Sequence, residues 1–171
     1  MVSFEEIQAA YYMVAATGVL VAAVYYISTL RNAQKTQQLQ LETRQAQLFM
    51  QIYGQSHNDP SFLDAWRKVM SLQWNTFEEH RNLLKQDENA RATQRVGSFY
   101  EGLGVLVKEK FVDIRLVALL MTIMTRTWWE KYKPIVEEGR RQMGYPRWMS
   151  ESEYLYNELM KYIEEHPELK T

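Results

Sequence analysis

The chain has 171 residues, a formal net charge of −1 and no cysteine. A net charge near zero gives the protein no overall positive electrostatic potential that would attract nucleic acid. The absence of cysteine excludes disulfides, thiolate catalysis and cysteine-based zinc or iron–sulfur sites. The mean hydropathy of −0.43 excludes a protein with many membrane spans. About 140 residues lie outside the one long apolar segment, which is enough for a single compact domain.

That apolar segment, residues 7–30, contains no charged side chain between Glu6 and Arg31. A helix rises about 1.5 Å per residue, so the segment is long enough to cross a hydrocarbon core of roughly 30 Å. A pair of tyrosines lies near each end, which is typical of the aromatic belts at the two membrane interfaces. These are Tyr11, Tyr12, Tyr25 and Tyr26. The sequence predicts one transmembrane helix over residues 7–30.

Two other interpretations of this segment are less consistent with its flanks and length. A cleaved signal peptide has a basic amino-terminal region, whereas this chain begins MVSFEEIQ. A buried core helix is usually shorter than this apolar run. The charges also predict an orientation, because Arg31, Lys35 and Arg44 follow the segment against only Glu42. The positive-inside rule then places residues 1–6 outside the cell membrane and the carboxy-terminal domain in the cytoplasm.

Residues 31–57 are predicted to continue this helix as a polar stalk, because residues 31–47 are rich in glutamine and free of glycine and proline. Leu41, Leu48 and Ile52 are spaced by seven and four, as in a short coiled-coil seam that drives self-association. The alternative is a solvated helix whose last turns join the domain, and the absence of sustained heptads favours it. Within the membrane segment, Gly18 and Ala22 form a small-x-x-x-small pair that would let two helices approach closely.

Residues 58–171 are predicted to form an all-α domain of five or six helices, because no alternating strand pattern of useful length occurs. Local signals mark the boundaries: capping boxes at Thr76 and Ser150, an amino cap at Asp113 and a carboxy-cap glycine at Gly144. Pro134 is expected either to break the chain or to open a helix. The expected helices cover residues 61–74, 77–85, 89–109, 113–129, 135–143 and 151–165.

Two segments of this domain are expected to lie in tight or buried surroundings. Residues 116–125 form an apolar run too short to span a bilayer, and they predict the central buried helix. The helix over 89–109 carries Gly97, Gly102 and Gly104, each of which costs up to about 1 kcal/mol relative to alanine. Close helix packing is the favoured explanation for these glycines, and a ligand pressed against the backbone is the alternative.

No catalytic or metal-binding motif is present in the sequence. His57, His80 and His166 have no second histidine three or four residues away, and each is predicted to be a solvated surface side chain. No nucleophile elbow, phosphate loop or dinucleotide fingerprint occurs. The sequence therefore predicts a protein that is not an enzyme and that requires no metal or cofactor.

Glu101 is the acidic residue of most interest, because it lies in a helix with an apolar face. A buried carboxylate has a raised pKa and serves as a base or a ligand in some pockets. The favoured alternative is a solvent-facing charge or an ion pair with an arginine of another helix. The candidate arginines are Arg115, Arg126, Arg140 and Arg141.

Aromatic residues are the candidates for an interface, because they concentrate in the cores of protein contacts. Trp129, Tyr145 and Trp148 are the expected contact residues, whereas Trp66 and Trp128 are expected in the core.

The strings SFYEGLGVLVKEKFVDIRLV and TWWEKYKPIVEEGRRQMG resemble the family of small proteins that share the domain of unknown function 4760. The resemblance implies an amino-terminal membrane helix followed by a cytoplasmic helical domain. It covers roughly residues 10–145, so the final helix is expected to lie outside it. It carries over no activity. The matching positions are Glu101, Gly104, Asp113, Trp128 or Trp129, and Arg140 or Arg141.

Together these features predict a membrane-anchored interaction or accessory module. Its expected partners are the lipid bilayer and other membrane proteins, or a second copy of the chain, and not nucleic acid. The alternative is a membrane-tethered ligand sensor with a pocket around Glu101 between helices of the domain. A pocket where Glu101 and an arginine converge would favour the sensor, and an exposed aromatic patch would favour the interaction module.

Overall fold

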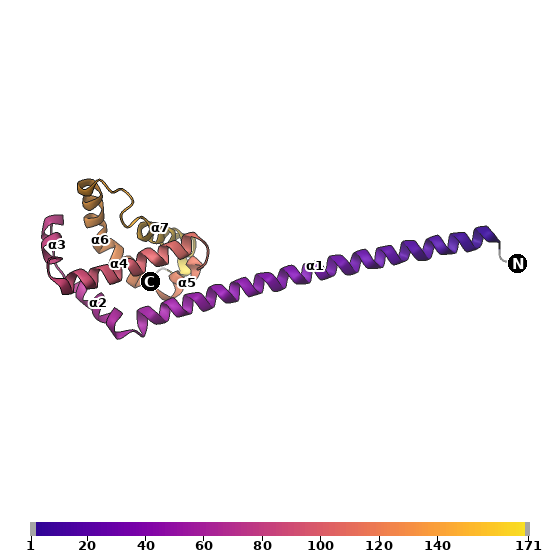
Figure 1. Cartoon of the computed structure of the whole chain (residues 1–171), viewed down its shortest axis with the longest axis horizontal. Coiled ribbons are helices and arrows are strands. Elements are labelled where there is room, and N and C mark those ends of the chain that lie inside the picture. The colour runs from indigo at the N-terminus through magenta and orange to yellow at the C-terminus, as the bar shows by residue number, and fades with distance from the viewer. Residues whose placement is uncertain (1–2, 170–171) are drawn as a thin grey trace. The chain divides into compact units, whose positions relative to one another are not determined.

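The computed structural model describes residues 3–169, and these form seven α-helices and one short 3₁₀ helix (Figure 1). No β-strand occurs between residues 3 and 169, which confirms the all-α prediction. The helices are α1 (Phe4–His57), α2 (Pro60–Ser71), α3 (Phe77–Leu83), α4 (Asp87–Lys108), α5 (Ile114–Leu120), α6 (Thr122–Met143), α7 (Ser150–Glu165) and η1 (Pro167–Leu169).

The chain divides into two compact units between Arg44 and Gln45. The first unit contains the predicted membrane segment, and none of its most apolar 18-residue window is buried. This helix, near the amino terminus, is the one helix of the described residues that is long and apolar enough to cross a membrane. The second unit, the helical domain, begins inside α1. Phe49 is fully buried in its core, so the last turns of the predicted stalk belong to the domain, as the favoured alternative expected.

In the helical domain, α4 packs against α2 and against α7. Its buried side chains Val96, Tyr100, Leu103 and Val107 recur at helical spacing, as the apolar pattern predicted. Burial of a large apolar side chain stabilises a fold by about 1.5–3 kcal/mol, so this face of α4 supplies much of the core.

Two of the three α4 glycines lie against α7 or the turn before it. A side chain at Gly104 would collide with the backbone carbonyl of Glu151, and one at Gly97 would lie 3.3 Å from the methyl group of Met149. Gly102 has open space around it. Close helix approach therefore explains Gly104. Gly97 is covered only by the flexible side chain of Met149, and close approach does not explain Gly102.

The structure differs from the sequence prediction between residues 113 and 143. The helix that Asp113 caps ends at Leu120, and α6 then runs without a break through Pro134. The expected break at Pro134 is wrong, because buried side chains on both sides of it, including Tyr132 and Ile135, hold the helix in place despite one missing backbone donor. The predicted central buried helix is also wrong, since three of its eight apolar side chains, those of Leu119, Leu120 and Ile123, are exposed.

Local capping signals were correct where a single side chain decides the boundary. The hydroxyl of Thr76 accepts a hydrogen bond from the amide of Glu79, and Asp113 accepts one from the amide of Arg115. Gly144 ends α6 with a φ of 65°, a conformation that glycine adopts without strain. The capping box predicted at Ser150 is wrong. Helix α7 begins at Ser150, so its N-cap residue is Met149, whose side chain forms no capping hydrogen bond.

We predict opposite effects for alanine at two glycines of α4. Gly104→Ala should lower the free energy of unfolding by on the order of 1–3 kcal/mol, because the new methyl group meets the α7 backbone. Gly102→Ala should raise it by about 0.5–1 kcal/mol, because the site is open and alanine favours helix. Urea unfolding of the full chain in mild detergent, followed by tryptophan fluorescence, measures both. Equal effects at the two positions would contradict the assigned packing.

Candidate functional site

An apolar pocket of about 670 Å³ lies between α3, α4, α6 and the turn before α7. We call it the α3–α4–α6 pocket. Its size falls in the range of small-molecule sites, which are mainly lined by apolar and aromatic side chains with a few polar groups. The main apolar residues of its wall are Phe77, Leu84, Trp128, Tyr132, Val136 and Trp148.

A column of aromatic rings separates α4 from α6 beside this pocket. The rings of Tyr100 and Trp128 stack with their centroids 4.7 Å apart, and those of Trp128 and Tyr132 stack at 5.4 Å. Two rings of this column, those of Trp128 and Tyr132, also line the pocket. Burial raises the pKa of Tyr132 to about 12, so its hydroxyl stays protonated.

His80 is the least expected residue of the site, because the sequence predicted it on the surface. Its side chain is 2% exposed, and its ring lies 4.8 Å from that of Trp74 and 5.5 Å from that of Tyr132. The Nε2 atom is buried and has no hydrogen-bond partner among residues 3–169. Burial lowers the pKa of His80 to about 4, so the imidazole is neutral at physiological pH.

Glu101 also lines the pocket, but its carboxylate is hydrogen-bonded to the start of α7. Its Oε2 atom accepts hydrogen bonds from the backbone amide of Ser152, at 2.6 Å, and from the Ser152 hydroxyl, at 3.2 Å. Ser152 lies in the first turn of α7, where backbone amides have no partner inside the helix. A negative charge there is stabilised by the helix dipole. Glu101 therefore caps α7 from a neighbouring helix.

The structure does not bring Glu101 together with any of the four candidate arginines. Arg126 pairs with Glu130, Arg140 with Glu153 at 2.6 Å, and Arg141 with Glu138. The side chain of Arg115 forms no ion pair with another described residue. The arginine that lines the pocket with Glu101 is Arg81, which the sequence analysis did not single out.

The three predicted interface aromatics occupy different surroundings. Trp129 is 2% exposed and packs near Trp128 and Tyr156, so it is a core residue and the interface prediction for it is wrong. Tyr145 is 59% exposed. Trp148 is half-buried, lies over Gly139 and lines the α3–α4–α6 pocket.

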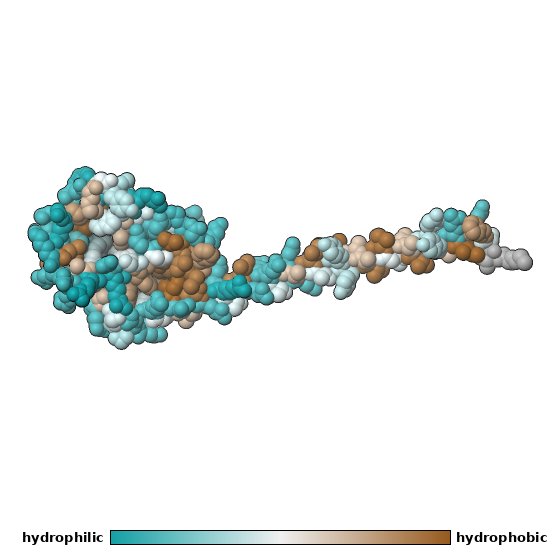
Figure 2. Space-filling model, in the orientation of Figure 1, coloured by the Kyte–Doolittle hydropathy of each residue, from teal (hydrophilic) through white to brown (hydrophobic). Residues whose placement is uncertain are grey.

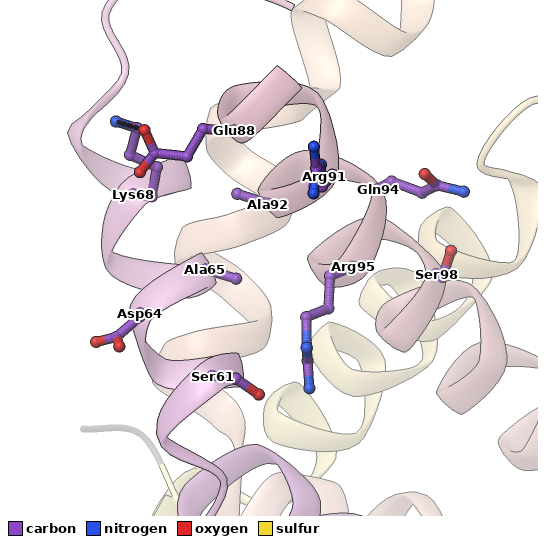
Figure 3. A pocket seen from close by; sticks show the side chains of 10 residues that line it. All are labelled: Ser61, Asp64, Ala65, Lys68, Glu88, Arg91, Ala92, Gln94, Arg95 and Ser98. Carbon is purple, nitrogen blue, oxygen red and sulfur yellow. Dashed lines mark ion pairs between the residues drawn. The ribbon is translucent and has the colours of Figure 1, made fainter. Parts of the chain in front are cut away.

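A second hollow, of about 580 Å³, lies between α2 and α4 and is rich in basic side chains (Figure 3). Lys68 lies 3.2 Å from Glu88, the pair drawn with a dashed line in Figure 3. Arg91 and Arg95 pair with Asp87 and Asp59. Each cation of this hollow therefore has an acidic partner, and the hollow has no excess charge to attract an anion. Among residues 3–169, no three acidic or histidine side chains cluster closely enough to hold a metal ion.

The family model of the domain of unknown function DUF4760 matches residues 12–159 of the chain. The chain belongs to this family, which confirms the resemblance. The match extends past residue 145 and includes most of α7, so the expectation that the final helix lies outside the family is wrong. Neither a curated protein nor a solved structure matches the chain.

We predict that His80 makes the domain less stable as the pH falls. The unfolded state takes up a proton near the ordinary pKa of 6.5, whereas the folded state does so only near a pKa of about 4. Between these values the unfolded state binds more protons, and the difference corresponds to about 3 kcal/mol of lost stability. His80→Phe keeps an aromatic ring beside Trp74 and Tyr132 but cannot take up the proton. Urea unfolding at pH 7 and pH 4.5 should show a smaller loss in this variant. Equal losses in variant and native chain would show that His80 is not buried in neutral form.

Proposed function

We propose that the chain is a membrane-anchored interaction module that is not an enzyme and that serves as an accessory subunit of a larger membrane assembly. The observation that carries this proposal is an exposed apolar surface on the helical domain. It is formed by Leu119 and Leu120 at the end of α5 and Ile123 at the start of α6, which are 50%, 44% and 70% exposed. We call these three residues the α5 surface.

The three side chains of the α5 surface border one hollow of about 460 Å³, together with His57 and Leu169. Figure 2 shows a hydrophobic area, coloured brown, over the part of the domain where Figure 1 labels α5. Exposed apolar groups that gather in one place are typical of protein contacts. Part of the apolar run over residues 116–125 is not buried within its own domain. Our proposal is that another protein covers this exposed part.

The charge beside this surface suggests the chemistry of the partner. Arg115 is exposed on the same helix and forms no ion pair with another described residue. Arginine is enriched among the residues that dominate protein interfaces. The best-fitting partner is a protein with an apolar helix face flanked by a carboxylate.

The proposed location is the cell membrane, with a single span, the amino terminus outside and the helical domain in the cytoplasm. Support comes from the uncharged run of residues 7–30 and from the basic residues that follow it. Within this run, Gly18 has no atom within 4 Å of the position a side chain would take. Gly18 and Ala22 offer a small-residue face to the anchor helix of a partner.

A second candidate function is a membrane-tethered ligand sensor, and one observation favours it. The α3–α4–α6 pocket is lined by both Glu101 and an arginine, Arg81, and it is large enough for a small molecule. Under this hypothesis the bound ligand would change how the domain presents its surface to other proteins.

Native extraction tests the accessory function. The full chain and an Ile123→Glu variant would be extracted in mild detergent, sized, and analysed by mass spectrometry for proteins that co-migrate. We expect one defined partner with the native chain and at least about a tenfold loss of it with Ile123→Glu, because a charge buried in a contact without a counterion is costly.

The matched control is Met50→Glu, which adds the same charge at an apolar residue that is 55% exposed and outside the α5 surface. It should retain the partner. A particle that contains only this chain, or equal loss in both variants, would contradict an accessory role through the α5 surface.

A further inference from the structure

We propose that the α3–α4–α6 pocket binds a small organic cation, a protonated amine on a mainly apolar body, and that Glu101 pairs with its ammonium group. The inference deepens the second candidate function, ligand sensing, and rests on it. It does not depend on the α5 surface. It names the charge of the ligand and the residue that selects it.

The fold uses only one of the two carboxylate oxygens of Glu101. Both hydrogen bonds from Ser152 go to the Oε2 atom. The Oε1 atom accepts no hydrogen bond from a described residue, and it is not among the buried side-chain atoms that lack a partner, so it has accessible surface. Because the Glu101 side chain is half-buried and lines the pocket, this second oxygen is available to accept a hydrogen bond from a ligand.

The neutral polar groups beside Glu101 suit a ligand of either charge. The residues of α4 that line the pocket recur at intervals of three and one, and so share one face: Ala90, Thr93, Gln94, Gly97, Ser98 and Glu101. Gln94 and Ser98 are exposed, and their side chains both donate and accept hydrogen bonds. The hydroxyl of Thr93 lies 3.4 Å from that of Tyr132. The choice between a cation and an anion therefore depends on the two charged residues of the wall.

Of these two residues, Glu101 has the stronger effect on a bound ligand. The guanidinium of Arg81 lies 3.2 Å from the carboxylate of Glu78, and its side chain is 59% exposed. Water screens such an exposed pair, whereas a half-buried carboxylate interacts with a ligand through a lower dielectric. The amino terminus of α7 offsets part of the Glu101 charge, but a helix end carries only about half a unit charge. A negative charge therefore remains beside the pocket, which attracts a cation and repels a carboxylate or a phosphate.

The rest of the wall fits the apolar body of such a ligand. Phe77, Val136 and Trp148 line the pocket, and aromatic and aliphatic side chains of this size bury apolar groups favourably. Met143 and Met149 line the side next to the turn before α7. Methionine side chains are flexible and polarisable, so this side can adjust to bodies of different outline.

The cysteine-free chain allows a direct test with the full-length protein in membranes. A single Ala90→Cys variant places a thiol in the pocket wall, and Arg91→Cys places one at the neighbouring position, where the native side chain is 79% exposed. The rate of reaction with methyl methanethiosulfonate, an uncharged thiol reagent, is measured with three probes that share one ring system: 2-naphthylmethylamine, 2-naphthalenemethanol and 2-naphthoate. We expect the amine to protect Ala90→Cys at about a tenfold lower concentration than the alcohol, because hydrogen bonds between charged groups are stronger. The naphthoate should protect least, and no probe should protect Arg91→Cys.

Two further substitutions, each added to Ala90→Cys, assign the charge preference to one residue. Glu101→Gln keeps a side-chain oxygen for Ser152 but removes the negative charge. It should weaken protection by the amine about tenfold and leave protection by the alcohol unchanged, whereas a general loss of structure would weaken both. The matched control Arg81→Gln removes the other charge of the wall and should leave the order of the three probes as it was.

The outcomes separate this inference from the function on which it rests. Failure of all three probes to protect Ala90→Cys would overturn both the site and the sensing function. Equal protection by the amine and the alcohol would overturn the cationic class alone, and so would strongest protection by the naphthoate that Arg81→Gln abolishes. Full protection by the amine in the Glu101→Gln variant would overturn the role of Glu101. None of these outcomes affects the co-purification result for the α5 surface.

Discussion

The contact between α4 and the start of α7 is the constraint on which the helical domain depends. The carboxylate of Glu101 accepts a hydrogen bond from the backbone amide of Ser152. Three residues further along α4, the absence of a side chain at Gly104 lets the Glu151 backbone approach closely. Arg140 of α6 pairs with Glu153 and donates to the carbonyl of Trp148, which ties the same turn to a third helix. One short stretch of chain is thus fixed by three independent partners.

This contact also shapes the pocket. Residues 145–149 join the end of α6 to the fixed start of α7, and three of them, Tyr145, Trp148 and Met149, line the pocket. Trp128 and Tyr132 of the aromatic column form another part of the pocket wall. The buried, neutral His80 packs against Trp74 and Tyr132 and also lines this pocket. Packing of the domain and the shape of the pocket therefore depend on the same residues.

The sequence predicts those features of the fold that local chemistry decides. Thr76, Asp113 and Gly144 act through hydrogen bonds or backbone angles within a few residues of themselves, so their roles could be read directly. The apolar spacing of α4 predicted its buried face for the same reason. Pro134 was misjudged because packing on both sides outweighs the one backbone donor it removes.

The site itself could not be predicted, because its residues are brought together only by the tertiary fold. Its wall draws on residues from 77 to 149, and no motif links His80 to Tyr132 or Glu101 to Ser152. The sequence did single out Glu101, but it offered a buried base or ligand, a solvent-facing charge or an arginine pair, whereas the structure places the carboxylate at a helix amino terminus. Leu119 and Ile123 were assigned to the core because hydrophobicity alone does not distinguish a buried apolar side chain from an exposed one.

Topology mapping tests most directly the claim that this chain is a cytoplasmic module held at the membrane by one helix. Single cysteines at Ser3 and Glu109, both exposed, are treated in intact cells with a maleimide that cannot cross membranes. The account predicts that Ser3→Cys reacts from outside, that Glu109→Cys reacts only after the cells are permeabilised, and that alkaline carbonate does not extract the protein. Labelling of Glu109→Cys from outside, or release of the protein by carbonate, would contradict it.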